Sequence, residues 1–436
     1  MNRLSILWHY LHTRRNFTRW TSRASLEAWQ EQQVLRHLAW VREHSPIYAE
    51  AWSDHSLTEW PTLPIVEKTL LMRRFDDWNT AGIKADQAWS VAQQAERSRD
   101  FSPTIRGITV GLSSGTSGSR GIFLASKSER ARWAGTLLGR ILRGTLHQSH
   151  RAALFLRADS NLYQSIGSQR FTFTFFDLLQ SAESQWPRLQ ELRPTILAAP
   201  PNALTKLATM PKASRLLAPL GLLFSVADVL DEVDRNLIEQ GFGQPVGQLY
   251  QATEGFLAAT CPHGSLHWNE DVLVVQKEWL DAAHTRYTPI ITDFRRTTQP
   301  IIRFRLNDVI VASTKTSCPC GSVFEMLAAI EGRQDDVFYL PALHGNQSVT
   351  LFPDFVRRAL ILALPEAVDY TVTQTAPDHW NIALSRLEET SLITAEIRQL
   401  CATSHAQMPE LTFTLLSPQP ASEKRRRVRR TMPEPT

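Results

Sequence analysis

"SAESQWPRLQELRPTILAAPPN", residues 181–202, decides the fold because it joins an amphipathic stretch directly to a short apolar run. The amphipathic part predicts a helix, and the apolar part, TILAA, predicts a buried strand. The alternation continues on both sides, with apolar runs at 152–156 and 221–226 and a second amphipathic stretch at 231–241 that ends in glycine. Alternating strands and helices predict an α/β fold, with a parallel sheet whose ligands lie at the carboxyl ends of the strands.

The segments before and after this region have different patterns. Residues 1 to about 100 show apolar side chains at helical spacing and predict mostly helices. From about 270 to 313 the helical pattern disappears, and runs such as VLVVQ and IIRFRLNDVIVAS predict strands. We therefore expect mixed sheets with flanking helices in the larger part of the chain.

The C-terminal hundred residues predict a separate small α+β domain. Helices are expected near 354–362 and 392–401, with a hairpin over 369–385. A unit of this size can bury a core of its own. We therefore expect a large domain over residues 1–334 and a small domain over residues 335–436.

Composition excludes several functional classes. The 436 residues include 47 Lys and Arg against 43 acidic residues, and part of the excess lies in the basic run 424–430. The remainder is close to neutral, which argues against a nucleic-acid partner. No uncharged apolar stretch of about 18 residues occurs, so no membrane span is expected. The apolar run before Arg14 and Arg15 is too short for a secretory signal, which predicts a cytoplasmic protein.

A run of hydroxyl side chains and glycines, LSSGTSGSRGIFL at residues 112–124, lies between two apolar segments. Backbone N–H groups of a tight glycine turn can converge on an anion, and hydroxyls beside them can donate to phosphate oxygens. The familiar G-x-x-x-x-G-K-[ST] phosphate loop is absent, because no Lys-Ser or Lys-Thr follows Gly118. By itself the run fits either a phosphate loop or an ordinary hairpin turn.

Further polar residues follow predicted strands. Glu254 could bind Mg²⁺, although a lone glutamate at a strand end is often only solvated. Asp308 could accept both hydroxyls of a ribose, and Arg333 follows it. Lys424 lies in the basic run, where composition alone favours a solvated or nucleic-acid-binding tail.

Taken in order, these stretches resemble the adenylate-forming superfamily of acyl- and aryl-CoA ligases. The resemblance is to the branch of phenylacetate-CoA ligases and deazaflavin-adenylating synthetases, and it runs from about residue 40 to the C-terminus. The matching stretches are Ser113-Ser114-Gly115-Thr116-Ser117-Gly118 for SSGTTG, Tyr250 to Glu254 for Y-G-x-T-E, PIIRFRLND for P-L-I-R-Y-x-x-G-D, Gly332 to Asp336 for G-R-x-D-D, and EKRRRV for G-K-x-x-R-V.

The resemblance implies a nucleotide site. The loop from Ser113 to Gly118 would bind the β- and γ-phosphates of ATP, with Thr116 among the catalytic residues. Glu254, preceded by Thr253, would bind Mg²⁺. The remaining roles would be Tyr250 along the adenine and Asp308 on the ribose with help from Arg333.

It also implies how the reaction proceeds. Lys424 would bridge the substrate carboxylate and the α-phosphate, and Asp335 would be the hinge about which the small domain rotates. Three positions depart from the family pattern: Arg120 replaces proline, Gln251 replaces glycine and Asn307 replaces glycine. These departures leave the acyl substrate open.

The implied function is ATP- and Mg²⁺-dependent activation of a carboxylic acid to an acyl-AMP, followed by transfer to a thiol, with coenzyme A as the expected acceptor. Apolar pocket walls near Ala199, Pro200 and Ser225 to Ala227 favour an aromatic or aliphatic acid. Alternatives are AMP transfer to a hydroxyl, as in the deazaflavin relatives, and a non-catalytic nucleotide-binding protein. The sequence does not indicate the oligomeric state.

Three of the four cysteines are grouped with histidines. The candidate ligands are Cys261, His263, His267, Cys318 and Cys320, more than enough for a tetrahedral Zn²⁺, although their spacing is not that of a standard zinc finger. Buried free thiols are the alternative. Members of the aryl-CoA ligase branch carry a similar group, and the resemblance favours His267 over His263. The expected metal is structural.

Overall fold

The computed structural model divides the chain into two compact units. Unit 1 consists of Met1–Leu230, Asp234–Leu306 and Ile310–Ala329, and unit 2 of Asp231–Val233, Asn307–Val309 and Ile330–Thr436. The residues that the structure describes are 3–98, 100, 102–113, 120–142, 148–156, 171–216, 221–345, 347–364, 368–387, 390–417 and 426–433.

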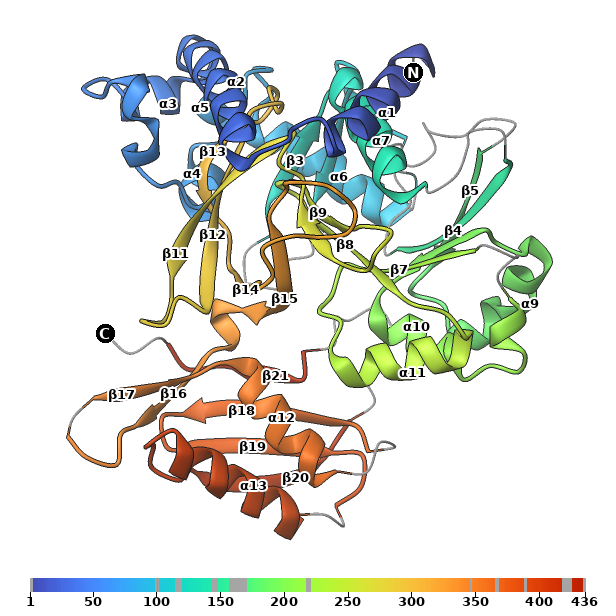
Figure 1. Cartoon of the computed structure of the whole chain (residues 1–436), viewed down its shortest axis with the longest axis vertical. Helices are drawn as coiled ribbons and strands as arrows, with labels where there is room; N and C mark the ends of the chain where they lie inside the picture. Colours follow the sequence, from blue (N-terminus) through green and yellow to red (C-terminus); the bar gives the residue numbers. More distant parts are fainter. Residues whose placement is uncertain are drawn as a thin grey trace. The chain divides into compact units, whose positions relative to one another are not determined.

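Unit 1 begins with helices, as the sequence predicts (Figure 1). The helix α2 starts after Ser22, whose hydroxyl accepts a hydrogen bond from the backbone N–H of Ser25 and so caps the first turn. The helices of this region are α1 (Arg3–Phe17), α2 (Arg23–His44), α3 (Pro46–Ala51), α4 (Lys68–Arg73), α5 (Phe75–Trp78) and α6 (Ala85–Ser98).

The parallel strands form one end of the main sheet, in the order β5-β4-β6-β7-β8, and all of them except β5 were predicted. The helices α9 (Ala182–Leu192), α10 (Pro201–Ala208) and α11 (Glu232–Phe242) connect them. The strands are β4 (His150–Leu156), β5 (Phe171–Asp177), β6 (Ile196–Ala199), β7 (Leu222–Val226) and β8 (Gly247–Ala252).

Both faces of β6 are buried, which explains its uninterrupted apolar sequence. Leu197 and Ala199 belong to the core shared with α9, α10 and α11. Ile196 and Ala198 belong to a second core on the opposite face, shared with α1 and α7 (Lys127–Ile141). Two helical layers therefore enclose the parallel strands.

Antiparallel strands continue the sheet from β8, in the order β9-β10-β15-β14-β12-β11, with β13 paired to β12. They are β9 (Gly255–Thr260), β10 (Leu266–Trp268), β11 (Leu273–Trp279), β12 (Arg286–Asp293), β13 (Ile301–Arg305), β14 (Asp308–Ala312) and β15 (Met326–Arg333). A separate small sheet holds β1 (Thr104–Ile105), β2 (Ile108–Leu112) and β3 (Ile122–Ala125). The Ser/Gly run lies between β2 and β3, as predicted.

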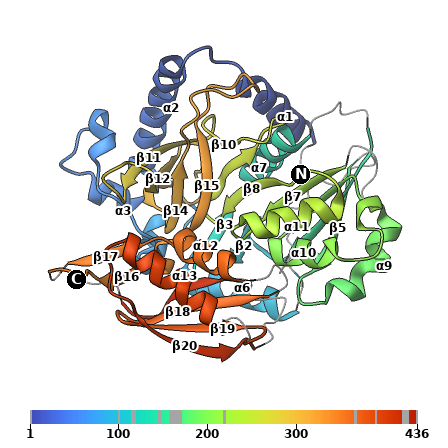
Figure 2. The same cartoon turned by 60° about the horizontal axis from the view of Figure 1, so that its bottom comes forward.

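Unit 2 has its own sheet, in the order β20-β19-β18-β21, and a smaller β16-β17 pair. The predicted helices and hairpin are confirmed (Figure 2). The helices α12 and α13 and the sheet share one core that includes Leu360, Ile382 and Ile397. Its elements are β16 (Phe338–Pro341), β17 (Ser348–Leu351), α12 (Pro353–Ala363), β18 (Tyr370–Ala376), β19 (His379–Leu384), α13 (Thr390–Thr403), β20 (Glu410–Leu415) and β21 (Val428–Arg430).

No helix within the described ranges is both long and apolar enough to cross a membrane.

Candidate functional site

Two tight turns of unit 1 bring the cysteine group together. Cys261 begins the turn between β9 and β10, where its backbone N–H donates to the Ser265 carbonyl at 2.8 Å. Cys318 begins a second turn, in which its carbonyl accepts from the Gly321 N–H at 3.1 Å. Gly264 and Gly321 have φ values of +83° and +75°, a left-handed conformation that favours glycine. Together the two turns bring the three cysteine sulfurs close to one another.

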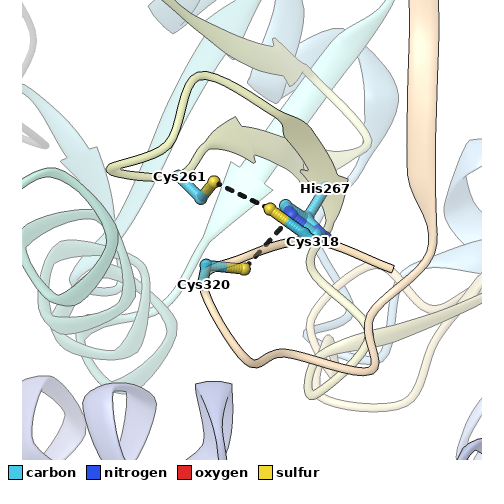
Figure 3. Close-up of side chains that lie close together, drawn as sticks. All are labelled: Cys261, His267, Cys318 and Cys320. Carbon is cyan, nitrogen blue, oxygen red and sulfur yellow. Dashed lines mark hydrogen bonds between the residues drawn. The ribbon is translucent and has the colours of Figure 1, made fainter. Parts of the chain in front are cut away.

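The four predicted ligand atoms form a compact cluster (Figure 3). All lie within 4.8 Å of one another, with 3.6 Å between the sulfurs of Cys261 and Cys318 and 3.5 Å between Cys320 Sγ and His267 Nε2. A tetrahedral zinc with Zn–S bonds of about 2.3 Å places its sulfurs about 3.8 Å apart. The cluster could therefore hold a metal ion of this size with small adjustments.

The surroundings of the cluster suit a metal ligand set. The Nδ1 atom of His267 lies 2.8 Å from the carbonyl oxygen of Phe324, so a proton on Nδ1 would donate to that oxygen and leave the lone pair of Nε2, on the side of the sulfurs, available to a metal. Burial lowers the pKa of His267, which favours the neutral ring that binds metals. Burial and the neighbouring thiols raise the pKa of Cys320 to about 12. A bound cation would favour the thiolate form instead.

The stem of the Ser/Gly loop is held by a ladder of hydrogen bonds. Ser113 follows β2, and its backbone N–H donates to the Gly121 carbonyl at 2.8 Å. The Gly121 N–H donates back to Ser113 Oγ at 2.7 Å. The predicted phosphate-binding residues Ser114, Gly115, Thr116, Ser117 and Gly118 lie outside the described residues.

A lysine from another segment reaches this stem. The ammonium of Lys68, at the start of α4, donates to Ser113 Oγ at 3.1 Å. A Cβ on Gly121 would lie 2.6 Å from Lys68 Cε, so the glycine gives the lysine side chain its space. Lys68 belongs to no sequence motif that links it to a loop 45 residues later, so its place here is not predictable from the sequence.

Arg120, which stands at the family's proline position, also holds the stem. Its Nε donates to the Ser113 carbonyl at 3.2 Å, and its Nη1 donates to Glu96 of α6 at 2.8 Å. Its Nη2 makes a second, parallel bond to the same carboxylate. A bidentate ion pair therefore ties the end of the loop to a helix.

The Tyr250–Glu254 stretch lies at the carboxyl end of the parallel strand β8, as predicted for a ligand site. Tyr250 is buried, with its ring 5.8 Å from that of Trp268. Thr253 Oγ1 donates to Glu254 at 2.9 Å, and the Thr253 carbonyl accepts from Arg296 at 2.5 Å. These contacts fix the turn that carries the candidate Mg²⁺ ligand.

The remaining residues of the predicted nucleotide site and hinge that the structure describes belong to unit 2. Asp308 begins β14, and Arg333 ends β15. The predicted hinge residue Asp335 accepts a hydrogen bond from the Asn307 side chain at 2.6 Å. Lys424 lies outside the described residues.

The chain is similar along nearly its whole length to a solved ligase. A crystal structure of 2-hydroxyisobutyryl-CoA ligase in the postadenylation state with R3-HIB-AMP matches with a TM-score of 0.68 and 16% identity, over 95% of this chain and 91% of that chain. The same ligase in an open conformation with 2-HIB-AMP and CoA matches with a TM-score of 0.56 and 16% identity, over 92% and 90% of the two chains. The chain has the fold of an adenylate-forming ligase.

The amide bond synthetase McbA from Marinactinospora thermotolerans matches with a TM-score of 0.51 and 15% identity, over 73% of this chain and 68% of that chain. No family model matches the chain, and no curated protein sequence matches it. The likeness to the solved 2-hydroxyisobutyryl-CoA ligase confirms the predicted fold class. The phenylacetate-CoA ligase and deazaflavin branch stays a prediction.

Proposed function

We propose that this protein activates a carboxylic acid with ATP, forming an acyl-AMP and releasing pyrophosphate, and then transfers the acyl group to the thiol of coenzyme A. The observation that carries this proposal is the likeness to a ligase over 95% of the chain, together with a threonine–glutamate pair at the carboxyl end of β8. The similar ligase was solved with acyl adenylates and with CoA. We propose residues 1–334 as the large domain and 335–436 as the small mobile one.

Different residues of this chain contribute to the first step of the reaction. The substrate carboxylate oxygen attacks the α-phosphorus of ATP, and the bond from that phosphorus to the pyrophosphate oxygen breaks. Lys424 lowers the repulsion between the two anions, and the Ser113–Gly118 loop holds the departing phosphates with its N–H groups and hydroxyls. Asp308 and Arg333 hold the ribose, and Tyr250 lies along the adenine.

The proposed magnesium ligand is Glu254. Its carboxylate is oriented by the Thr253 hydroxyl, and Mg²⁺ favours such oxygen ligands beside phosphates. The ion would supply charge neutralisation for the leaving pyrophosphate.

We assign the Cys261, His267, Cys318 and Cys320 cluster to a structural Zn²⁺. Four protein ligands complete a tetrahedral shell and leave no open position for chemistry. The metal would tie the turn after β9 to the turn before β15.

The test is ATP–pyrophosphate exchange with Mg²⁺ across aryl, fatty and amino acids. Exchange that depends on one acid supports the proposal. Lys424→Ala should reduce exchange by about 100-fold or more while ATP binding persists, and Glu254→Gln should raise the Mg²⁺ concentration required. Lys315→Ala, a change to an exposed lysine, is the matched control.

Two results would contradict the proposal. Full exchange by Lys424→Ala would mean that this lysine is not catalytic. Absence of exchange with every acid, from protein that binds ATP, would favour AMP transfer to a hydroxyl or a non-catalytic binding role.

A further inference from the structure

The helix α1 turns an apolar stripe toward solvent. Leu4, Leu7, Trp8 and Leu11 are 74%, 41%, 56% and 55% exposed. Their spacing of three and four residues places them on one face of the helix. Single exposed apolar side chains are ordinary, but a contiguous group on one helix face marks a contact surface.

The packing of α1 keeps this stripe outward. The opposite face lies against α7 (Figure 1). Ile6 and Tyr10 belong to the core there. Gly135 and Gly139 of α7 allow the two backbones to approach closely. A Cβ on Gly135 would lie 2.7 Å from the Ile6 carbonyl oxygen, and one on Gly139 would lie 2.8 Å from Thr13 Cγ2. The helix cannot rotate its stripe inward without losing this contact.

The charged side chains of α1 itself are of one sign. The helix contains three arginines, Arg3, Arg14 and Arg15, and neither aspartate nor glutamate. Arg3 and Arg15 are exposed near the two ends of α1. Two copies pairing through this helix would bring arginines together, whereas an anionic surface would attract them.

We propose that the α1 stripe, defined as Leu4, Leu7, Trp8 and Leu11, docks the protein on an anionic lipid surface. The helix lies in the plane of the headgroups, the leucines enter the boundary with the acyl chains, and the arginines contact lipid phosphates. Tryptophan is the residue type enriched at this depth of a bilayer. This attachment requires no membrane span and does not depend on the proposed reaction.

The test is co-sedimentation of the full chain with vesicles of phosphatidylcholine alone and of phosphatidylcholine mixed with phosphatidylglycerol. We expect binding to the mixed vesicles only, and weaker binding as salt screens the arginines. The double variant Leu7→Ser, Trp8→Ser should lose most of this binding, and Arg15→Gln should weaken it several-fold. Leu179→Ser and Leu362→Ser, which change side chains that are 59% and 66% exposed elsewhere, should bind as the parent does.

Circular dichroism of the double variant checks that the fold persists, which we expect because both side chains are exposed. Three outcomes would overturn the proposal: binding to neither vesicle, equal binding by the double variant, or equal binding to both lipid compositions. Sedimentation velocity without lipid tests whether the stripe instead pairs two copies of the chain. A dimer that the double variant converts to a monomer would assign the stripe to self-association instead.

Discussion

Lys68 brings a positive charge to the stem of the Ser/Gly loop, whose own Arg120 is already paired with Glu96. Its ammonium lies 3.1 Å from Ser113 Oγ, and no carboxylate of the described residues is within ion-pair distance of it. A compact cation at the base of a phosphate loop can bind ATP phosphates. We therefore predict that Lys68→Ala weakens ATP binding by about tenfold, as expected for one lost charge-assisted hydrogen bond.

Isothermal titration with ATP and Mg²⁺ measures this effect, and Lys68→Arg should restore part of the affinity because it keeps the charge. Lys84→Ala is the matched control, since the ammonium of Lys84 already pairs with Asp76 at 3.0 Å and is largely exposed. Unchanged ATP affinity in Lys68→Ala would mean that the lysine stabilises the stem of the loop and does not bind ATP.

The residues of the candidate sites differ in whether the sequence alone predicts their role. The cysteines were predictable because metal ligands are few in type and grouped in two short segments. The same pattern left His263 and His267 as alternatives, and only the family resemblance favoured His267. Lys68 was not predictable, because only tertiary packing brings α4 to the end of β2. The Arg120–Glu96 ion pair likewise joins segments with no shared pattern.

Among the elements, the two turns that carry the cysteines are the ones that the proposed zinc would join. We predict that purified protein contains about one zinc per chain, and that Cys318→Ser lowers this content and the melting temperature together. A metal at a thousand times its Kd stabilises the fold by about 4 kcal/mol. Elemental analysis and thermal unfolding with and without a chelator measure both effects.

Cys401→Ser is the control for this experiment. Cys401 is a buried thiol of α13, outside the cluster, so its substitution should leave the zinc content unchanged even where it lowers stability. A zinc-free protein whose melting temperature is insensitive to chelators would mean that the cluster consists of packed thiols.

The strands of the parallel sheet were predictable where both faces are buried, as in β6. A short, continuous apolar run is compatible with few structures other than a buried strand. The edge strand β5 was missed. Its sequence, FTFTFFD, alternates with threonine and lies at the end of the sheet order, where burial is less complete. The expectation of a ligase fold came from the family resemblance, which rests on the order of short motifs. Local periodicity alone does not indicate that fold.

At the scale of the whole molecule, each unit has a core of its own, and we predict that the two unfold in separate calorimetric transitions. Ile382 is fully buried in the unit 2 core, so Ile382→Ala should destabilise that unit by about 2–5 kcal/mol. Removal of metal from the unit 1 cluster should lower the other transition. A single transition that both changes lower equally would show instead that the chain unfolds as one cooperative body.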